Sequence, residues 1–367
     1  IFSLFLIFLM IEFAGLTGSA IAKSPDEKEY RQRVSKRITG KSVGVEDIPI
    51  ITLHGKQLVS IGNIFSLIAP PGTGKSNIGE GISSSAENEY CDTFGFKVNL
   101  PEGKKVLLCD TERTNNDCIK GFNRIIRRTE TDPAEMKDGE FEKIIFLSFI
   151  ASESFDESRK DIEDIVESGE VGLLILDGIG DFIASVNEEE TTKELVRWLI
   201  VLSNKYGLGV MVTIHPNPKD PSYKPTGHLG SFLLKKSESV MVVCKADNNT
   251  RLITTNFEHG KVRNAHDVLE TAIEWNDAHR MFMTADITLA KNKNEKGKKI
   301  DELMKKIFTL KPHYIYGDLL EIIKKEKGCK DTAANSMITQ ALELNIIKEH
   351  RNTYSLNDMD SDDEVPF

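Results

Sequence analysis

Residues 69–76 read Ala-Pro-Pro-Gly-Thr-Gly-Lys-Ser, and this stretch carries the strongest structural signal in the chain. It follows the apolar run Ile64–Ile68 and precedes a segment with helical periodicity, so we expect it to turn a strand into a helix. Gly72 and Gly74 allow backbone N–H groups to converge on phosphate oxygens, and the start of the helix adds a positive field. The pattern indicates a phosphate-binding loop, with Ala69 in place of the usual first glycine.

Polar residues in this loop and at a later strand end are of the types that hold a nucleoside triphosphate and its metal. We expect Lys75 to reach the β- and γ-phosphates of ATP, and Ser76 to supply an oxygen to Mg²⁺. Asp177 follows the apolar run Leu173–Leu176, where an acid faces the ligand crevice and can hold Mg²⁺ through water; the alternative is a helix cap. The predicted metal ligands are Ser76 and Asp177, and the predicted nucleotide-binding residues are Ala69, Pro70, Pro71, Gly72, Thr73, Gly74, Lys75, Ser76 and Asn77.

Two further residues that follow apolar runs are candidates for the hydrolytic step. Glu112 follows the strand and turn Val106–Thr111, where a carboxylate can orient or deprotonate the attacking water. Asp110 competes for that role, and a surface Glu in the first turn of a helix is the structural alternative. His215 follows Val210–Ile214 and is a candidate sensor of the γ-phosphate, although a bare His after a strand is as often without such a role.

Short apolar runs alternate with helical periods from Ile48 to about Asp286, which indicates an α/β domain with a largely parallel sheet. A helix is predicted over residues 188–206, with Gly207 as its stop. The predicted strands are Ile64–Ile68, Lys105–Cys109, Ile144–Phe149, Leu173–Leu176 and Gly209–Ile214, followed by antiparallel strands at Val240–Cys244, Leu252–Asn256 and Ala272–Met283.

The rest of the chain divides into further parts. Met10 is the expected initiator, with residues 1–9 as upstream sequence; a signal or anchor segment and a docking helix are the alternatives. Three short helices and a hairpin near the end form a winged-helix pattern. We expect a lead-in over residues 1–45, an ATPase core over 46–288, a basic linker over 289–299, the winged-helix-like unit over 300–357 and an acidic tail over 358–367.

Charge and cysteine usage limit the function classes. The chain has 367 residues and a formal net charge of −10, so it is not expected to coat nucleic acid over its whole surface. Its five cysteines are widely spaced and form no Cys-x-x-Cys pair, which argues against a disulfide framework or a zinc site. A reducing, cytoplasmic location is expected, and the apolar run at residues 1–11 is too short to span a bilayer.

These motifs resemble those of RecA-like P-loop ATPases, and more closely the RepA-type hexameric replicative helicases, which are AAA-family ATPases of plasmids and mobile elements. A glutamate on the second strand, rather than beside Asp177, points to the RecA side. The resemblance implies that Glu112 is the catalytic carboxylate and His215 the sensor, and that Lys261 and Arg263 reach the ATP site of the neighbouring subunit in a hexamer. Its anchors are Ala69–Ser76, Cys109–Glu112, Leu173–Asp177, Thr213–His215 and Gly227–Ser231.

Two loops are expected to face the pore of such a ring. The first, residues 178–192, is acidic, whereas the second, residues 216–236, is basic and contains Tyr223 and Phe232 as stacking platforms for single-stranded DNA. A plain surface loop is the alternative for the second. Its basic residues are Lys219, Lys224, His228, Lys235 and Lys236; a further basic cluster, expected to be a solvated or intersubunit face, is Arg113, Lys120, Arg124, Arg127 and Arg128.

The final residues, Asp362–Phe367, resemble the acidic tip of bacterial single-stranded-DNA-binding proteins and predict docking to partner proteins; a solubilising tail is the alternative. The function predicted overall is an ATP-hydrolysing oligomeric motor on single-stranded DNA. A regulatory or recombinase ATPase without unwinding activity is one alternative. An ATP-switched winged-helix DNA-binding adaptor is the other.

Overall fold

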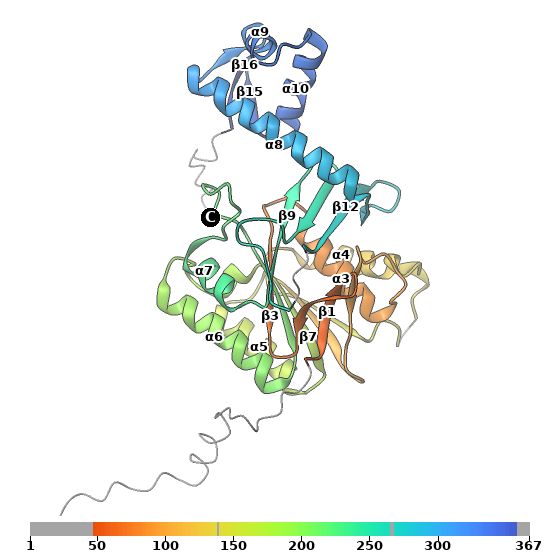
Figure 1. Cartoon of the computed structure of the whole chain (residues 1–367). Coiled ribbons are helices and arrows are strands. Elements are labelled where there is room, and N and C mark those ends of the chain that lie inside the picture. The colour runs from red at the N-terminus through yellow and green to blue at the C-terminus, as the bar shows by residue number, and fades with distance from the viewer. Residues whose placement is uncertain (1–46, 138, 265–267, 358–367) are drawn as a thin grey trace, which may run out of the picture. The chain divides into compact units, whose positions relative to one another are not determined.

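The computed structural model describes residues 47–137, 139–264 and 268–357. The expected lead-in over residues 1–45 and the acidic tail with Asp362–Phe367 lie outside these residues. A ten-stranded mixed sheet forms the centre of the larger part (Figure 1). The predicted α/β class with a mainly parallel sheet is confirmed.

Six of the strands run parallel, and their carboxyl ends bring the predicted loop, Glu112, Asp177 and His215 to one edge of the sheet. Strand β8 lies between β3 and β7, so the strand before the phosphate-binding loop and the strand ending in Asp177 are not neighbours. In spatial order the parallel strands are β9 (Ser239–Lys245), β3 (Ile64–Ile68), β8 (Gly209–Ile214), β7 (Val171–Asp177), β5 (Lys105–Asp110) and β6 (Ile144–Ser148).

Antiparallel strands extend the sheet on the side of β9, as the sequence predicts. Their order outward is β10, β12 and β13, and β11 pairs separately with β9. Their bounds are β10 (Thr250–Thr254), β11 (Lys261–Val262), β12 (Glu270–Asn276) and β13 (Met281–Thr284).

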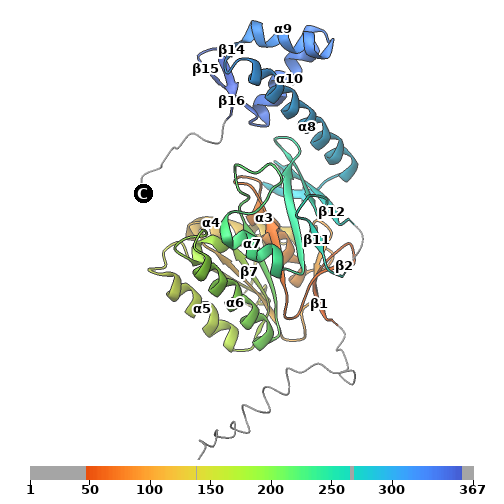
Figure 2. The ribbon, with the colours of Figure 1, turned by 60° about the vertical axis from the view of Figure 1, so that its left-hand side comes forward.

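Helices cover both faces of the parallel strands, which explains why these strands are apolar along their whole length. Every residue of β7 is buried. Two separate cores result, one under α5, α6 and α7 and the other under α3 and α4 (Figures 1 and 2). The helices are α3 (Lys75–Glu87), α4 (Asn115–Arg128), α5 (Phe155–Glu167), α6 (Glu189–Tyr206) and α7 (Gly227–Lys236), with short 3-10 turns η1 (Pro133–Glu135) and η2 (Ile179–Phe182).

A small antiparallel sheet, which the sequence did not predict, lies beside the main one. It contains β1 (Pro49–Leu53), β2 (Lys56–Ser60) and β4 (Phe96–Val98), with β1 in the middle. β1 and β2 form a hairpin through His54 and Gly55, both of which have positive φ.

The basic segment expected to be a linker, residues 289–299, is part of a continuous helix instead. Helix α8 spans Ile287–Leu310, and Asp286 caps it by accepting a hydrogen bond from the Leu289 N–H at 2.9 Å. Lys and Glu favour helices, and Lys293 is paired with Asp247 at 2.8 Å. A polar composition was therefore compatible with helix here, because capping and ion pairs stabilise it.

The C-terminal part contains the three helices and the hairpin that the sequence predicts. The last turns of α8 pack with α9 and α10 around Met304, Leu319 and Ile338. The winged-helix assignment remains a prediction. The other elements are β14 (Tyr314–Ile315), α9 (Tyr316–Lys327), α10 (Asp331–Glu343), β15 (Ile347–His350) and β16 (Thr353–Leu356), with β16 central in a three-stranded antiparallel sheet.

A buried ionic network joins the two helices behind the phosphate-binding loop. The carboxylate of Glu80 in α3 is fully buried and pairs with Arg124 through two hydrogen bonds, of 2.7 and 2.8 Å. Arg113 bonds both Glu80, at 2.7 Å, and Asp110, at 2.5 Å. The guanidinium of Arg128 lies over the ring of Phe94, 4.4 Å from its centroid. Arg113, Arg124 and Arg128 are thus packed against the interior, which corrects the expectation of a solvated or intersubunit face for these three residues, whereas Lys120 of the same cluster is exposed.

We predict that Glu80→Ala lowers the free energy of unfolding by about 3–5 kcal/mol, because the largely buried guanidinium of Arg124 loses its counter-ion and that of Arg113 keeps only Asp110. Urea unfolding followed by circular dichroism measures the change. Glu194→Ala, at an exposed position of α6, is the matched control and should change stability by less than about 0.5 kcal/mol. Equal losses of stability in both variants would contradict the role of Glu80 as the counter-ion of this network.

No helix in the described part of the chain combines the length and the apolar character needed to cross a membrane.

Candidate active site

The predicted phosphate-binding loop is the turn between β3 and α3. Gly72 and Gly74 have φ of +69° and +86°, in the left-handed region that favours glycine. A Cβ atom on Gly74 would lie 2.6 Å from the Phe282 ring, whereas one on Gly72 would meet no atom within 4 Å. The loop is therefore tightly packed where α3 begins and open at Gly72, which leaves room for phosphate beside the backbone.

Three of the predicted residues converge beside this loop. The side chain of Lys75 is only 9% exposed, and its Nζ forms an ion pair with the Glu112 carboxylate and lies 3.2 Å from His215 Nε2. Glu112 Oε1 is 3.5 Å from the same His215 nitrogen. His215 Nδ1 donates to the Ala69 carbonyl at 2.9 Å, which fixes the orientation of the ring. The loop, the end of β5 and the end of β8 thus contribute to one cluster.

The charges of this cluster keep Glu112 ionised. Its hydrogen bond with His215 and its ion pair with Lys75 lower its pKa to about 2, although partial burial opposes this shift. An ionised carboxylate next to the lysine of a phosphate-binding loop can accept a proton from a water molecule aimed at the γ-phosphate.

Asp177 and Ser76 provide a set of oxygen donors that fits Mg²⁺. Asp177 is buried at the end of β7, and its carboxylate accepts hydrogen bonds from Ser76 and, at 2.7 Å, from the Thr213 hydroxyl. Burial raises the pKa of Asp177, and nearby Lys75 opposes the shift. A carboxylate and a hydroxyl beside a phosphate site are ligands that Mg²⁺ prefers. The geometry therefore fits the predicted metal role of both residues.

Asp110, the competing candidate for the catalytic carboxylate, is fully buried and already bonded. It accepts the backbone N–H groups of Glu112 and Arg113 at 3.0 and 2.8 Å and pairs with the Arg113 guanidinium. Its role is to shape the turn that presents Glu112. The geometry favours Glu112 as the group facing Lys75.

Lys261 and Arg263 lie apart from the loop of their own chain. Both side chains bond the carbonyl of Ser237 at the end of α7, Lys261 at 2.5 Å and Arg263 at 3.4 Å. Lys261 also donates to the Leu234 carbonyl at 3.3 Å. This placement gives them no part in the cluster around Lys75 of the same chain.

The two expected pore loops are shorter than the sequence suggested. The second ends at Thr226, is closed by a bridge between Pro216 and Pro225, and leads into α7; the first contains η2 and ends where α6 begins at Glu189. Phe232 lies on α7, with the ammonium groups of Lys193 and Lys235 at 5.7 and 5.6 Å from its ring centre. It remains half-exposed.

The expectation that Tyr223 is an exposed stacking platform is wrong. Its ring packs against the core under α6 and α7, and its hydroxyl bonds Cys244, with burial raising the pKa of the phenol. An aromatic residue in a Pro-rich loop anchors that loop here, which sequence alone does not distinguish from a ligand-facing position.

Sequence reasoning gave no role to Thr213 and Thr111. Thr213 donates to Asp177 and accepts the Gly178 N–H at 2.9 Å, and Thr111 donates to Asp181 at 2.7 Å. A lone hydroxyl in the apolar run of β8 was the available signal for Thr213. A Cβ atom on Gly178 would lie 2.3 Å from the Thr111 hydroxyl. Position 178 must therefore be glycine for the turns after β5 and β7 to lie against each other.

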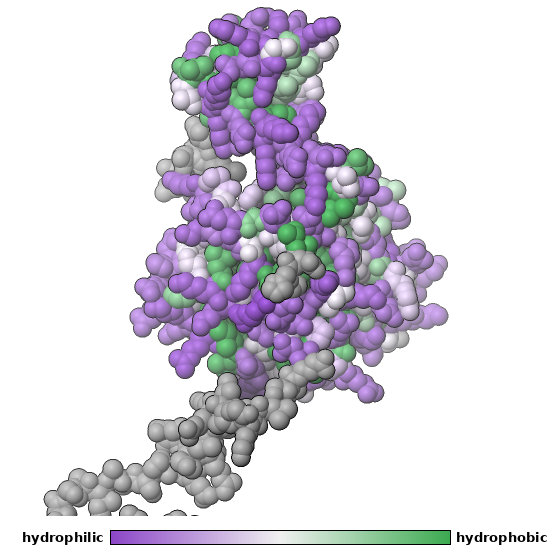
Figure 3. All heavy atoms as spheres, viewed as in Figure 1, coloured by the Kyte–Doolittle hydropathy of each residue, from purple (hydrophilic) through white to green (hydrophobic). Residues whose placement is uncertain are grey.

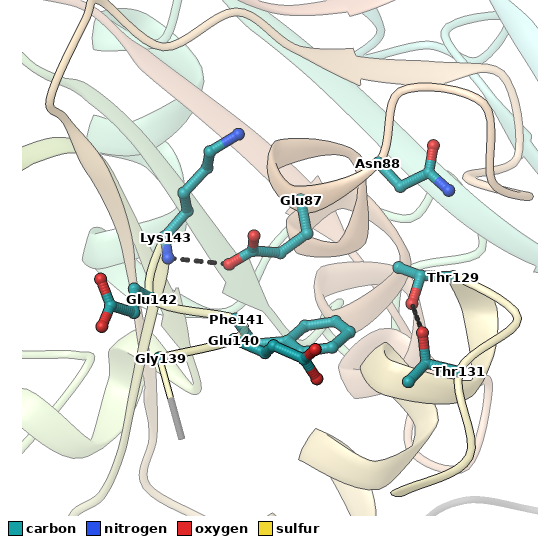
Figure 4. Close-up of a pocket in the computed structure, with 9 residues that line it drawn as sticks. All are labelled: Glu87, Asn88, Thr129, Thr131, Gly139, Glu140, Phe141, Glu142 and Lys143. Carbon is teal, nitrogen blue, oxygen red and sulfur yellow. Dashed lines mark hydrogen bonds between the residues drawn. The ribbon is translucent and has the colours of Figure 1, made fainter. Parts of the chain in front are cut away.

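A separate cavity of about 580 Å³ lies at the opposite end of α3, around Glu87, Thr129 and Lys143 (Figure 4). The Glu87 carboxylate accepts the Lys143 N–H at 2.7 Å, and burial raises the pKa of Glu87. The cavity shares no residue with the phosphate-binding loop.

Comparison with protein-family models gives a match to an AAA domain over residues 50–220. The comparison with curated proteins gives no match. The matched range contains Lys75, Glu112, Asp177 and His215, and it supports a P-loop ATPase domain in this part of the chain. It does not include Lys261, Arg263 or the C-terminal part.

We predict that Lys75→Ala abolishes ATP binding, because it removes the cation that we expect to contact the phosphates. Glu112→Gln should retain binding but lower the hydrolysis rate by about 10²–10⁴-fold, the usual contribution of general-base catalysis. Fluorescent-nucleotide titration and phosphate release measure the two effects. Glu89→Gln, an exposed substitution, is the control, and a Glu112→Gln variant with normal turnover would contradict the assignment.

We also predict a pH-dependent contribution of Glu112 to stability. Its folded pKa of about 2 lies below the unfolded value of ~4.3, so its ion pairs stabilise the fold above about pH 4. This contribution is lost as the pH falls from ~4.3 toward 2. In urea unfolding, the stability difference between wild type and Glu112→Gln should shrink between pH 5 and pH 3, with Glu194→Gln as the control. A difference in free energy of unfolding that stays constant from pH 5 to pH 3 would contradict the lowered pKa of Glu112.

Proposed function

We propose that the chain is an ATP-hydrolysing motor that acts on single-stranded DNA as an oligomer, of the replicative-helicase type found on plasmids and mobile elements. The observation that carries the ATPase part is the convergence of Lys75, Glu112, Asp177 and His215 at the carboxyl ends of parallel strands.

The ion pair between Lys75 and Glu112 suggests how hydrolysis is triggered. The γ-phosphate of ATP replaces Glu112 as the ion-pair partner of Lys75. The released Glu112 carboxylate then turns to the attacking water and accepts its proton. Water oxygen then bonds the γ-phosphorus while the bond to ADP breaks. Ser76 and Asp177 would hold Mg²⁺, which neutralises charge on the phosphates when bound.

Hydrogen bonds lead from this cluster to both loops. Thr226, at the start of α7, binds the His215 carbonyl through its N–H and its hydroxyl, each at 3.1 Å. The Val186 carbonyl in the other loop accepts the Leu229 N–H of α7 at 3.2 Å. Movement of His215 with nucleotide state is therefore transmitted to both loops.

The DNA and partner proposals rest on surface chemistry. Exposed Lys224, Lys235 and Lys236 with half-exposed Phe232 offer phosphate contacts and one stacking platform after β8. We further propose a hexamer in which Lys261 and Arg263 act on the neighbouring subunit's ATP, a cytoplasmic location, and docking of partner proteins on Asp362–Phe367.

The first test is ATP hydrolysis with and without single-stranded DNA, with Lys75→Ala as the negative control. DNA stimulation lost in Lys75→Ala supports the motor. Hydrolysis indifferent to DNA would overturn it in favour of a regulatory ATPase, and binding without turnover would favour a nucleotide switch.

A mixing experiment tests the shared site. Glu112→Gln subunits lack the catalytic carboxylate but keep Lys261 and Arg263, whereas Arg263→Ala subunits lack Arg263 but keep the carboxylate. We therefore predict that each variant has little activity alone. In a random equal mixture, about one quarter of head-to-tail interfaces would combine the two intact parts and recover hydrolysis. No recovery on subunit exchange would contradict action across the interface. The control uses Lys160→Ala, a substitution at an exposed position of α5, in place of Arg263→Ala. This variant should be active alone.

A further inference from the structure

Helices α9 and α10 form a helix–turn–helix arrangement in the C-terminal part. Gly328, at φ +61°, ends α9, and only residues 328–330 separate it from α10. Leu319 and Ile323 of α9 share a core with Ala334 and Ile338 of α10. In DNA-binding proteins this connection places the second helix in the major groove.

The outward face of α10 has an unusual composition for a solvated helix. Thr332, Asn335, Ser336 and Thr339 are all exposed and share one side of the helix, and no charged residue lies between Asp331 and Glu343. The exposed face of α5, in contrast, is charged, with an ion pair between Lys160 and Asp164.

Hydrogen-bonding groups on this face match the edges of bases. The Tyr316 hydroxyl donates to Asn335 Oδ1 at 2.9 Å, which orients the amide and leaves its Nδ2 group as a donor. Asn, Ser and Thr are side chains that read base edges in the major groove, where carboxylates on the same face would be repelled by phosphate. The acid at the start of α10, Asp331, is neutralised by Lys324 at 2.7 Å.

Cations flank this face. Lys325, Lys327 and Lys330 are exposed around the turn before α10, and no ion pair engages them within the described residues. Arg351 is exposed at the tip of the β15–β16 hairpin, where it and Asn352 have φ of 49° and 60° in a two-residue turn. The visible surface of this part is largely hydrophilic (Figure 3).

We propose that α10 binds in the major groove of duplex DNA and reads its sequence through Asn335 and Thr339. Lys327 and Lys330 bind the phosphate backbone beside the groove, and Arg351 contacts the flanking backbone. This duplex site is separate from the single-stranded DNA site proposed for the ATPase domain and does not depend on ATP hydrolysis. Charge complementarity favours DNA over a protein partner here, because exposed lysines that form no ion pair in the described part of the chain lie around the turn that leads into the neutral polar face.

The experiment measures binding of the full chain to a fluorescent 30-base-pair duplex of random sequence. Relative to wild type, Lys327→Glu/Lys330→Glu should weaken binding at least tenfold and reduce the slope of log affinity against log salt by about 2, the value for two lost phosphate contacts. Lys160→Glu/Lys205→Glu, on α5 and α6, makes the same change in net charge and should have no such effect. Unchanged ATP hydrolysis and circular dichroism show that the variants fold.

A second experiment tests whether α10 recognises the base sequence of the duplex. Selection from a random duplex pool should enrich a motif with wild type and lose it with Asn335→Ala/Thr339→Ala, whose affinity for the unselected pool stays within about twofold, since the phosphate contacts remain. Absence of duplex binding, or equal loss in the α5/α6 control, would overturn the proposal and favour a protein-docking role. Duplex binding without any enriched motif would overturn base reading by α10.

Discussion

The carboxyl ends of parallel strands meet at one edge of the sheet, and the candidate site depends on this constraint. Because β8 separates β3 from β7, a ligand held by the loop after β3 faces Asp177 across the end of β8. His215 occupies that middle position and contacts Lys75 and Glu112. The loop after β3 and the residues that follow β5, β7 and β8 thus meet because of the strand order alone, although they are far apart in the chain.

The buried ionic network stabilises this edge from behind. Glu80 belongs to the helix that starts at the phosphate-binding loop, and Asp110 ends the strand before Glu112. Arg113 bonds both, so the position of helix α3 and that of the turn before Glu112 are linked by one guanidinium group. A shift of either element would expose unpaired charge in the interior, which makes the geometry rigid.

Much of the fold and of the site followed from the sequence because parallel strands buried on both faces are continuous apolar runs with polar residues at their ends. The loop, Asp177 and Glu112 could be placed in this way. Side-chain direction could not be predicted in this way. Tyr223, Arg124 and Arg128 are of types that suit a surface, but long-range contacts with Cys244, Glu80 and Phe94 pack them against the interior. The helical state of residues 289–299 likewise depends on a cap and on ion pairs of Lys291 and Lys293 with Glu270 and Glu274 of the distant strand β12.

The ion pair between Lys75 and Glu112 also has a consequence for selectivity among anions. A cationic loop with open backbone N–H groups attracts any phosphate or sulfate in solution. Here an internal counter-ion already neutralises the lysine, so an incoming anion must displace a carboxylate that His215 also stabilises. Inorganic phosphate has only its own oxygens with which to offset that displacement, whereas a nucleotide also carries a base, a sugar and further phosphates that can form contacts. The ion pair between Lys75 and Glu112 therefore opposes the binding of small anions at this loop.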